Sequence, residues 1–439
     1  WSHATLGASG TNPAGFSSGT ATNLEIVVPA DKKGAFIQRS APGTGTVSSA
    51  DVQLVWNFVS NGVSASKSAR GKVFAVELVH VSEGSFYAGD GTTTTIQGQF
   101  ESATNGTPFL ITNQSYTITL GGGGAGSLGN NNAAGMYGVD DFDDTINRTL
   151  PAAFPKGYAA FYLMKTEISQ RQYCDFLNTL TATQQGARHY SPLNFNSYRN
   201  FIKKTSGSPA VFGCDANDNA GVATNASAAL LNETTDGEWV ACDYFTWMDG
   251  AAYADWAALR PMTELEFEKA CRGTLTAVSN EYAWGNTTVG PTDSLTDPNT
   301  AQETPVQGNC SYGRSYGTYR CGFYASASSS RQDAGAGYYG ALDLSGSLWE
   351  LVVSVGNGTG RGFTGTHGDG NLSANGNANV ADWPGWTGSE VTSAGGTGWR
   401  GGSFFDPEPR IRVSSRDFGC YADAARHDYF GWRAARSAP

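Results

Sequence analysis

Hydrophobic residues near the N-terminus recur at strand-like spacing. Residues 24–28 and 52–58 are rich in β-branched and aromatic side chains that partly alternate with polar ones, and Gly/Ser/Thr-rich turns separate them. Short runs of this kind bounded by turn residues are typical of strands. Residues 1–70 are therefore predicted to form a small all-β domain, either a sandwich or a sheet.

The pattern changes at Gly71. Residues 72–87 predict two strands joined by a turn at Glu83 and Gly84. Residues 93–142 are rich in Gly and Asn, which predicts a long insertion or exposed loop at about 90–150.

Three later segments combine helical apolar spacing with a helix start signal. Each begins at a Ser or Thr that can cap the first turn, and a Gln, Asp or Glu follows three positions later. The three starts are Ser169, Thr246 and Thr263. The second helix is expected to stop at Arg260-Pro261, because a residue before proline disfavours helical geometry. Few helices among many short strands and loops predict an irregular α+β domain over residues 71–439.

Charge and hydropathy argue against two kinds of partner, nucleic acid and a membrane that the chain would span. The net charge of -11 argues against nucleic acid, and the lack of a long apolar run predicts no membrane span. Because the chain begins at Trp1 and lacks a signal-peptide pattern, we interpret it as a processed or truncated protein. Of the seven cysteines, Cys310 with Cys321 and Cys214 with Cys242 are candidate disulfides, and buried reduced thiols are the equal alternative.

The C-terminal segment is rich in arginine. Seven arginines and no lysine lie between Arg400 and Pro439. A planar guanidinium makes several fixed hydrogen bonds, whereas an ammonium is a point charge. We therefore expect these arginines to hold irregular backbone together.

Seven motifs also follow the order of a known family. They occupy residues 76–89, 164–178, 259–270, 282–286, 343–350, 400–403 and 431–433. They resemble the opening strand pair, the E-V-T-N helix, the R-L-P-T-E segment, Y-P-W-G, the D-M-x-G-N-V-W-E loop, R-G-G-S and G-F-R of the formylglycine-generating enzyme (sulfatase-modifying factor) family. The resemblance implies an elaborated C-type-lectin-like fold over about residues 71–436, preceded here by the small all-β domain.

The resemblance does not extend to the family's catalytic residues. The enzyme needs two cysteines just after R-G-G-S, which bind copper(I), a soft ion that prefers thiolates. Residues 404–411 contain no cysteine, and Cys420 is the nearest. Copper is therefore not expected, and no catalytic residue is assigned. Related iron-dependent sulfoxide synthases need a histidine cluster, and the five histidines here are scattered.

Calcium is the metal that the resemblance favours. In the family loop a side chain, two backbone carbonyls and a Glu bind calcium, and these positions correspond to Asp343, Gly346, Leu348 and Glu350. Calcium takes six to eight hard oxygens in flexible loops. The alternative is that Asp343 caps a turn and Glu350 pairs with an arginine.

A second calcium site of the family would use Asn309 and the carbonyl of Cys310. Cys321 stands where the family has an Asp, so this site departs from the family pattern.

A further group of residues is typical of a recognition surface on a rigid scaffold, because mixed aromatic and polar side chains lie between fixed Arg and Gly positions. These residues are Phe404, Phe405, Asp406, Tyr421, His427, Asp428 and Tyr429. Variable proteins diversified by retroelements use this fold with changing residues in this segment. Ordinary loop chemistry is the alternative.

The sequence thus predicts a non-catalytic, secreted or cell-surface protein that resembles bacterial members of the family, with a structural or binding role in adhesion or a surface assembly. Expected partners are other surface proteins or copies of itself, with glycan as a further candidate. Two alternatives remain: an oxygen-dependent oxidase of the formylglycine-generating type, and a lectin-like or variable receptor.

Overall fold

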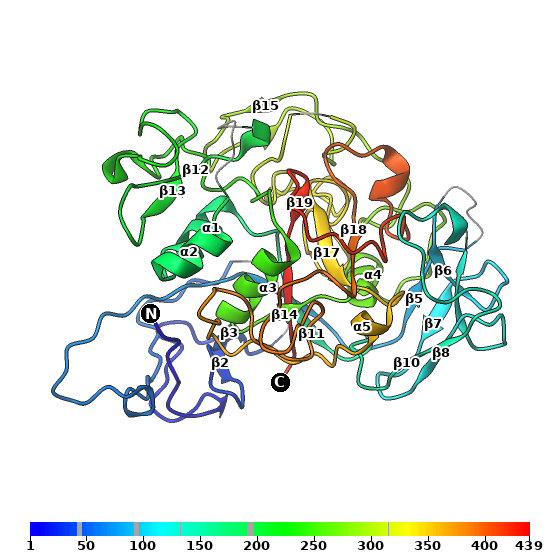
Figure 1. The fold of residues 1–439 in the computed structure, drawn as a ribbon, viewed down its shortest axis with the longest axis horizontal. Helices are drawn as coiled ribbons and strands as arrows, with labels where there is room; N and C mark the ends of the chain where they lie inside the picture. The colour runs from blue at the N-terminus through cyan, green and yellow to red at the C-terminus, as the bar shows by residue number, and fades with distance from the viewer. Residues whose placement is uncertain (42–45, 92–95, 132, 191–196, 315) are drawn as a thin grey trace.

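Short strands and a few helices are arranged around a central four-stranded sheet in an α+β fold (Figure 1). The computed structural model describes residues 1–439 except 42–45, 92–95, 132, 191–196 and 315. In the described part of the chain, no helix has the length and apolar character needed to cross a bilayer.

The central sheet joins the two ends of the family-like region. Its antiparallel order is β14 (Arg260–Pro261), β20 (Ala434–Ser437), β11 (Phe161–Met164) and β4 (Leu78–Val81). Val81 and Leu163 are buried on its inner side, whereas Tyr162 lies between His80 and Arg436 on its outer face.

A second sheet carries the two C-terminal motifs. Strand β17 (Trp349–Val353) is buried along its whole length, pairs antiparallel with β18 (Thr397–Arg400) and pairs parallel with β19 (Phe430–Gly431). The two motifs therefore flank β17 and do not pair with each other.

The predicted helices are confirmed, with capping boxes formed at all three starts. They are α1 (Gln170–Leu177), α3 (Trp247–Trp256) and α4 (Glu264–Arg272). Helix α3 ends before the predicted stop, and Arg260–Pro261 forms β14 instead. Helix α2 (Ala182–Arg188) was not predicted, although Thr181 and Gln184 form a capping box there as well. Helix α5 (Gly358–Arg361) is a single turn.

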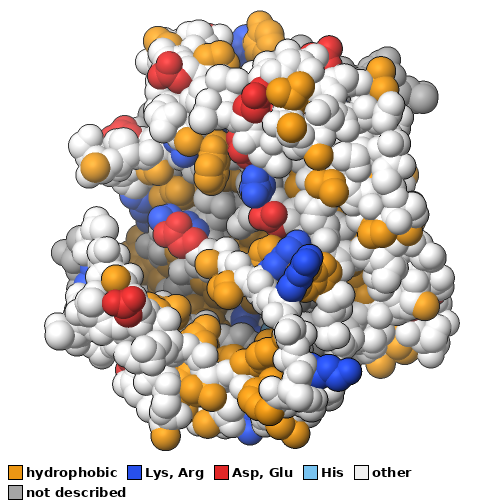
Figure 2. Space-filling model, turned by 90° about the vertical axis from the view of Figure 1, so that its left-hand side faces the viewer, with side chains coloured by type: hydrophobic (Ala, Val, Ile, Leu, Met, Phe, Trp, Pro, Cys, Tyr) orange, Lys and Arg blue, Asp and Glu red, His pale blue; other side chains and the backbone are white. Residues whose placement is uncertain are grey.

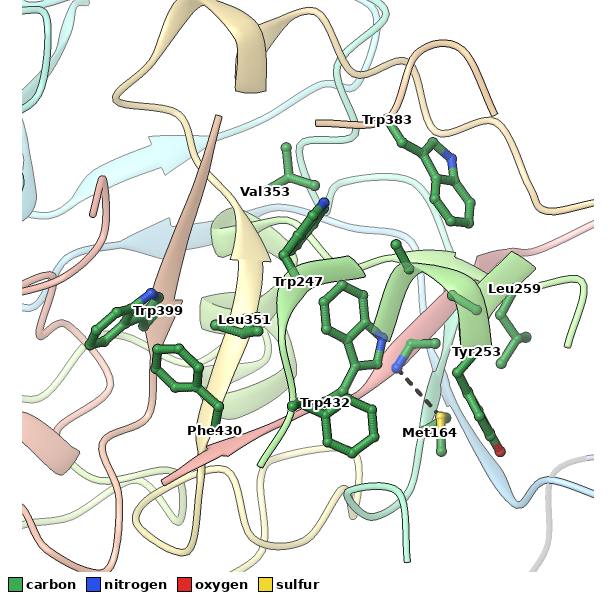
Figure 3. Close-up of a cluster of buried hydrophobic side chains, with 14 of the residues drawn as sticks. Met164, Trp247, Tyr253, Leu259, Leu351, Val353, Trp383, Trp399, Phe430 and Trp432 are labelled. Atoms are coloured by element: carbon green, nitrogen blue, oxygen red, sulfur yellow. Dashed lines mark hydrogen bonds between the residues drawn. The ribbon is translucent and has the colours of Figure 1, made fainter. Parts of the chain in front are cut away.

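The main hydrophobic core extends from the 90–150 region past α1 to α3 and β17, and Figure 3 shows its part around α3 and β17. Trp247 and Trp432 pack with ring centroids 4.7 Å apart. Gly250 allows this contact, because a Cβ atom there would lie 1.9 Å from the Trp432 ring.

Of the two alternatives predicted for about 90–150, the exposed loop is wrong, and the insertion stays a prediction. The described residues of this region form the sheet β10-β8-β9-β6, and β7 pairs with β5. The strands are β5 (Phe86–Ala88), β6 (Gln99–Ser102), β7 (Phe109–Ile111), β8 (Ile118–Leu120), β9 (Leu128–Asn131) and β10 (Arg148–Leu150). Phe100, Leu120 and Leu128 are fully buried in the main core, so their apolar surface stabilises the Gly-rich segment. The two predicted strands within 72–87 exist as β4 and β5, but they pair with different partners.

At the N-terminus, β1 (Gly10–Thr11), β2 (Leu24–Val28) and β3 (Phe36–Arg39) form a three-stranded sheet. The predicted strand at 52–58 is wrong, since this segment makes only isolated bridges at Gln53 and Trp56. The remaining elements are short. They are the pairs β12 (Ile202–Lys204) with β13 (Phe212–Cys214) and β15 (Leu295–Thr296) with β16 (Thr304–Pro305), and the 3-10 turns Val59–Asn61, Ala133–Gly135, Ser197–Arg199, Ala228–Leu230 and Glu408–Ile411.

Candidate functional site

The 343–350 loop is held in a tight, buried turn. Asp343, Gly346 and Ser347 all adopt positive φ. A Cβ atom at Gly346 would lie 2.2 Å from the carbonyl oxygen of Ser311, so only glycine fits there without displacement. The loop also bonds to the C-terminal segment, because the Gly346 amide donates to the Gly401 carbonyl (2.8 Å) and the Phe404 amide donates to the Ser347 carbonyl (2.8 Å).

The two carboxylates of this loop have protein partners. Asp343 Oδ2 accepts a bond from the Gly322 amide at 2.7 Å, and Glu350 Oε1 lies 2.7 Å from Arg433 Nη2. Arg433 also donates to the carbonyls of Met164, Lys165 and Leu342. These contacts match the alternative in which Asp343 caps a turn and Glu350 pairs with an arginine.

Glu167 is a third carboxylate at this site, and the sequence analysis missed its role. It is fully buried and accepts bonds from Ser347 Oγ (2.8 Å) and the Leu348 amide (3.0 Å). Its position in the E-V-T-N-like motif was the available signal.

The positions of the second predicted calcium site are also bonded within the protein. Asn309 Oδ1 accepts from the Gly290 amide (2.9 Å), and Asn309 Nδ2 donates to the Gln332 carbonyl (3.0 Å). The buried Cys310 thiol donates to the Ser345 carbonyl at 3.0 Å.

Two buried arginines of the C-terminal segment bind the acidic face of helix α4, a partner that was not predicted. Arg400 contacts Glu264 (3.1 Å) and Glu268 (2.6 Å), and Arg416 joins Glu264 to Asp140 at 2.7 Å each. All five side chains are buried. This lattice fixes the C-terminal segment against α4 and against the 90–150 region.

Four aromatic side chains form a partly exposed group on the surface. We define the aromatic face as Tyr198, Phe405, His427 and Tyr429. The ring centroid of Phe405 lies 5.0 Å from that of Tyr198 and 6.5 Å from that of Tyr429, and His427 stacks on Tyr429 at 4.9 Å. Phe405 is 37% exposed, and the other three are partly exposed.

Tyr198 was not predicted, because it lies about two hundred positions before Phe405. Tyr198 and Arg199 both have positive φ. Arg199 holds this conformation by donating to Glu303 Oε1 (3.0 Å) and to the Thr318 carbonyl (2.7 Å). Left-handed backbone at consecutive bulky residues is costly and tends to occur at functional sites.

The other predicted ligand-binding residues lie around or behind this face. Phe404 is fully buried under Phe405. Asp406 is turned inward, where it accepts a bond from the Ser403 amide and pairs with Arg410 at 3.0 Å. Tyr421 packs on the buried Trp399 at 5.2 Å, and Asp428 is half-buried, which raises its pKa.

The sequence-family comparison matches residues 122–438 to the sulfatase-modifying factor enzyme 1-like domain. The chain belongs to this family. No curated protein matches the sequence.

Solved structures similar to this chain include three with low identity. CarF is 13% identical over 84% of this chain and 100% of its own, with a TM-score of 0.33. Treponema denticola variable protein 1 is 15% identical over 80% and 95%, with a TM-score of 0.30. The Major Tropism Determinant U1 variant is 13% identical over 98% and 83%, with a TM-score of 0.24. At these scores the similarity is remote, and the family assignment rests on the sequence match.

In this sulfatase-modifying factor-like chain, the segment after the R-G-G-S-like motif holds no pair of thiols. All seven cysteines are free, so neither candidate disulfide is formed. Burial raises the pKa of the Cys420 thiol, the one nearest the R-G-G-S-like motif, to about 12, which disfavours the thiolate that copper(I) would need. Burial also raises the pKa values of the Cys310 and Cys321 thiols.

The 343–350 loop has the donor chemistry for calcium. Burial raises the pKa values of Glu167, Asp343 and Glu350, while the guanidinium of Arg433 opposes this effect. A divalent cation would offset the surplus negative charge. No three acidic, His or Cys side chains among the described residues converge as a metal site, so the carbonyls of Gly346 and Leu348 would have to supply further ligands.

In another acidic loop, residues 215–221, the carboxylates bind the ammonium group of a lysine. The fully buried Lys203 Nζ lies 2.7 Å from Asp215 Oδ2, 2.5 Å from Asp218 Oδ1 and 2.6 Å from the Gly221 carbonyl. Three oxygens of residues 215–221 therefore contact the ammonium group of Lys203.

Proposed function

We propose that this member of the sulfatase-modifying factor family is a non-catalytic binding protein of the bacterial exterior, either secreted or held at the cell surface. It contacts its partner through the aromatic face, in adhesion or within a surface assembly. The partner is another surface protein or a further copy of this chain, and a glycan is the alternative ligand.

The aromatic face is the observation that supports this proposal most directly. Phe405 occupies the segment in which the enzymes of the family carry their paired cysteines, and it is the most exposed member of the aromatic row. Aromatic side chains supply large contact areas at small entropic cost, which makes them frequent anchors of interfaces. The buried Phe404 packs against Phe405, and Arg199, next to Tyr198, bonds Glu303 and the Thr318 carbonyl; these contacts support the row without a ligand.

The competing oxidase function lacks its metal ligands. Cys420 stands alone, and its raised pKa keeps it protonated at neutral pH. A copper(I) titration should show no tight stoichiometric binding. Tight binding that disappears in Cys420→Ser would restore the oxidase as the leading function.

The binding function can be tested on a glycan array and with candidate surface proteins as probes. Phe405→Ala combined with Tyr429→Ala should abolish a signal that the parent protein gives. Tyr338→Ala is the matched control, because Tyr338 is 40% exposed and lies outside the aromatic face. Equal binding by the parent and the double variant would refute the role of the aromatic face.

We further propose that calcium binds the 343–350 loop through Asp343, Glu350 and the two carbonyls, with Asn309 and Cys310 as a weaker second site. Chelation should lower the melting temperature of the parent protein, and Glu350→Ala should remove the difference between calcium and chelator. A melt that is the same with and without chelator would show that the loop uses Arg433 alone.

A further inference from the structure

The N-terminal unit, defined as residues 1–61, has too small a core to be stable alone. Its cluster of fully buried apolar residues consists of Leu6, Ile26 and Val28. Its described residues also include exposed large apolar side chains, namely Ile37, Leu54, Trp56, Phe58 and Val59, which are 37–69% exposed. Small units with little buried apolar surface need additional contacts. The unit therefore depends on the surface against which it packs.

That surface is the outer face of the central sheet. Phe36 stacks on Tyr162 with centroids 4.3 Å apart, and the Tyr162 hydroxyl donates to Gln38 Oε1 at 2.5 Å. Asp31 Oδ2 lies 2.6 Å from Arg436 Nη2. A stacked ring pair, a hydroxyl bond and an ion pair make this contact specific in geometry.

The connection between the unit and the sheet is long and exposed. Residues 62–77 form no helix or strand, and none of them is buried. In Figure 1 this segment loops away from the body, and Figure 2 shows a hollow with hydrophobic side chains inside it on the same side of the molecule. Fully extended, such a connection spans about 50 Å at ~3.3 Å per residue. Although Phe74 packs on Trp256 at 5.0 Å, the connection is long enough for the unit to reach a docking surface other than its own.

Charge and strand edges favour a second copy of this chain as the occupant. The three cations Lys32, Lys33 and Arg39 balance the three anions Glu25, Asp31 and Asp51, so residues 1–61 carry no net charge while the whole chain carries -11. A neutral unit can approach another acidic copy without net repulsion. Among the described strands, β1 and β3 each pair with β2 alone, and β4 pairs with β11 alone, which leaves open edges on both partners.

We propose that the N-terminal unit of one copy docks on the outer sheet face of a second copy through the same contacts of Phe36, Gln38 and Asp31 with Tyr162 and Arg436. The exposed connection then bridges the two bodies and links copies of the chain into dimers or longer assemblies. The aromatic face takes no part in this contact, so the inference stands independently of the ligand-binding proposal.

Crosslinking between two differently tagged full-length chains tests the exchange. A Phe36→Cys chain mixed with a Tyr162→Cys chain should form a disulfide-linked heterodimer under mild oxidation. Val59→Cys mixed with Tyr162→Cys is the matched control, because Val59 is exposed on the same unit but lies outside the contact. If the first pair forms no more heterodimer than the control pair while both chains keep the parent melting temperature, the proposal is wrong.

Shortening the connection gives a second readout that keeps Phe36 and Tyr162 intact. Deletion of residues 64–71 should hinder docking within one chain and raise the mass measured by light scattering to that of a dimer or larger species. A deleted chain that stays monomeric would overturn the exchange. The Phe36→Cys and Tyr162→Cys pair should crosslink equally when both chains also carry Phe405→Ala, which separates failure of this inference from failure of the proposed function.

Discussion

Replacing the fully buried Arg400 by Met should destabilise the protein strongly. The guanidinium bonds Glu264, Glu268 and the Val413 carbonyl, and all of these contacts are buried. The substitution leaves the carboxylates in place without one of their cations. Removing one partner of a buried ion pair costs about 3–5 kcal/mol.

The structure sets the expected loss toward the lower part of that range. Glu264 keeps Arg416 at 2.7 Å, and Glu268 keeps Arg272 at 3.0 Å and the Gly89 amide at 2.7 Å. The Val413 carbonyl loses its charged donor, which costs about 1–3 kcal/mol for a buried acceptor. We therefore expect a loss of about 3–4 kcal/mol in the free energy of unfolding at neutral pH.

The loss should also depend on pH. Burial raises the pKa of Glu268, but the charges of Arg400 and Arg272 outweigh it, and the net pKa lies below its usual value. A carboxylate whose pKa is lower in the folded than in the unfolded state stabilises the fold at pH values above its unfolded-state pKa of about 4.3. This contribution disappears as the pH falls through the folded-state pKa. Without Arg400 the pKa of Glu268 rises, so protonation relieves the variant and the difference from the parent should shrink toward about pH 4.

Urea unfolding followed by tryptophan fluorescence measures the effect, since the chain has 11 tryptophans. Arg148→Met is the control, because Arg148 pairs with Asp141 at 3.8 Å and is 44% exposed, and exposed pairs contribute about 0–1 kcal/mol. A loss in Arg400→Met no larger than in this control, or one that is unchanged at acidic pH, would refute the reasoning.

Three further outcomes are expected. Gly346→Ala should lower the free energy of unfolding by more than about 2 kcal/mol, because it adds a Cβ atom 2.2 Å from the Ser311 carbonyl at positive φ. Gly124→Ala is the control, because its Cβ atom would meet nothing within 4 Å, and equal urea midpoints for the two variants would contradict the prediction. Thr263→Ala should lose about 1–2 kcal/mol of stability, because it removes the cap of α4 and the bond to the Pro155 carbonyl. Thr263→Ser should keep most of this stability in the same urea assay. A serine variant as unstable as the alanine variant would exclude capping as the cause. Native protein at about pH 8 should react slowly with a thiol reagent, because the pKa of Cys420 is about 12, burial raises the pKa of Cys321, and the other five thiols are buried. All seven thiols should react in denaturant, and fewer than seven would reveal a disulfide.

Local signals explain which elements could be predicted. The starts of α1, α3 and α4 were found because a capping box and an apolar stripe are complete within a dozen residues. The 90–150 region was misjudged because glycine content outweighed short alternations such as residues 118–120, whose outer members are buried and whose middle one is exposed. The strand predicted at 52–58 was wrong because its alternating pattern was given too much weight: among the described residues the segment has no partner strand and makes only isolated bridges.

The site depended on pairings that no local pattern encodes. The family motifs located the 343–350 loop, the C-terminal segment and the segment that contains Glu167, but not the contact between Glu167 and Leu348, which are 181 positions apart. Arg416 and Glu264 are 152 positions apart. These residues become partners because strands β17 to β20 bring distant segments together. The charge pattern of a single sequence allows many equivalent pairings of acidic residues with arginines.

Lys203 gives the protein a cation that dialysis cannot remove. The oxygens of Asp215, Asp218 and Gly221 hold its ammonium as they would hold a bound ion, but the aliphatic chain of the lysine tethers it. Loop 215–221 should thus keep its shape in any concentration of chelator. Hydrogen exchange of its amides supplies an internal reference, so a calcium-dependent change at residues 343–350 can be distinguished from a general effect of the chelator on the fold.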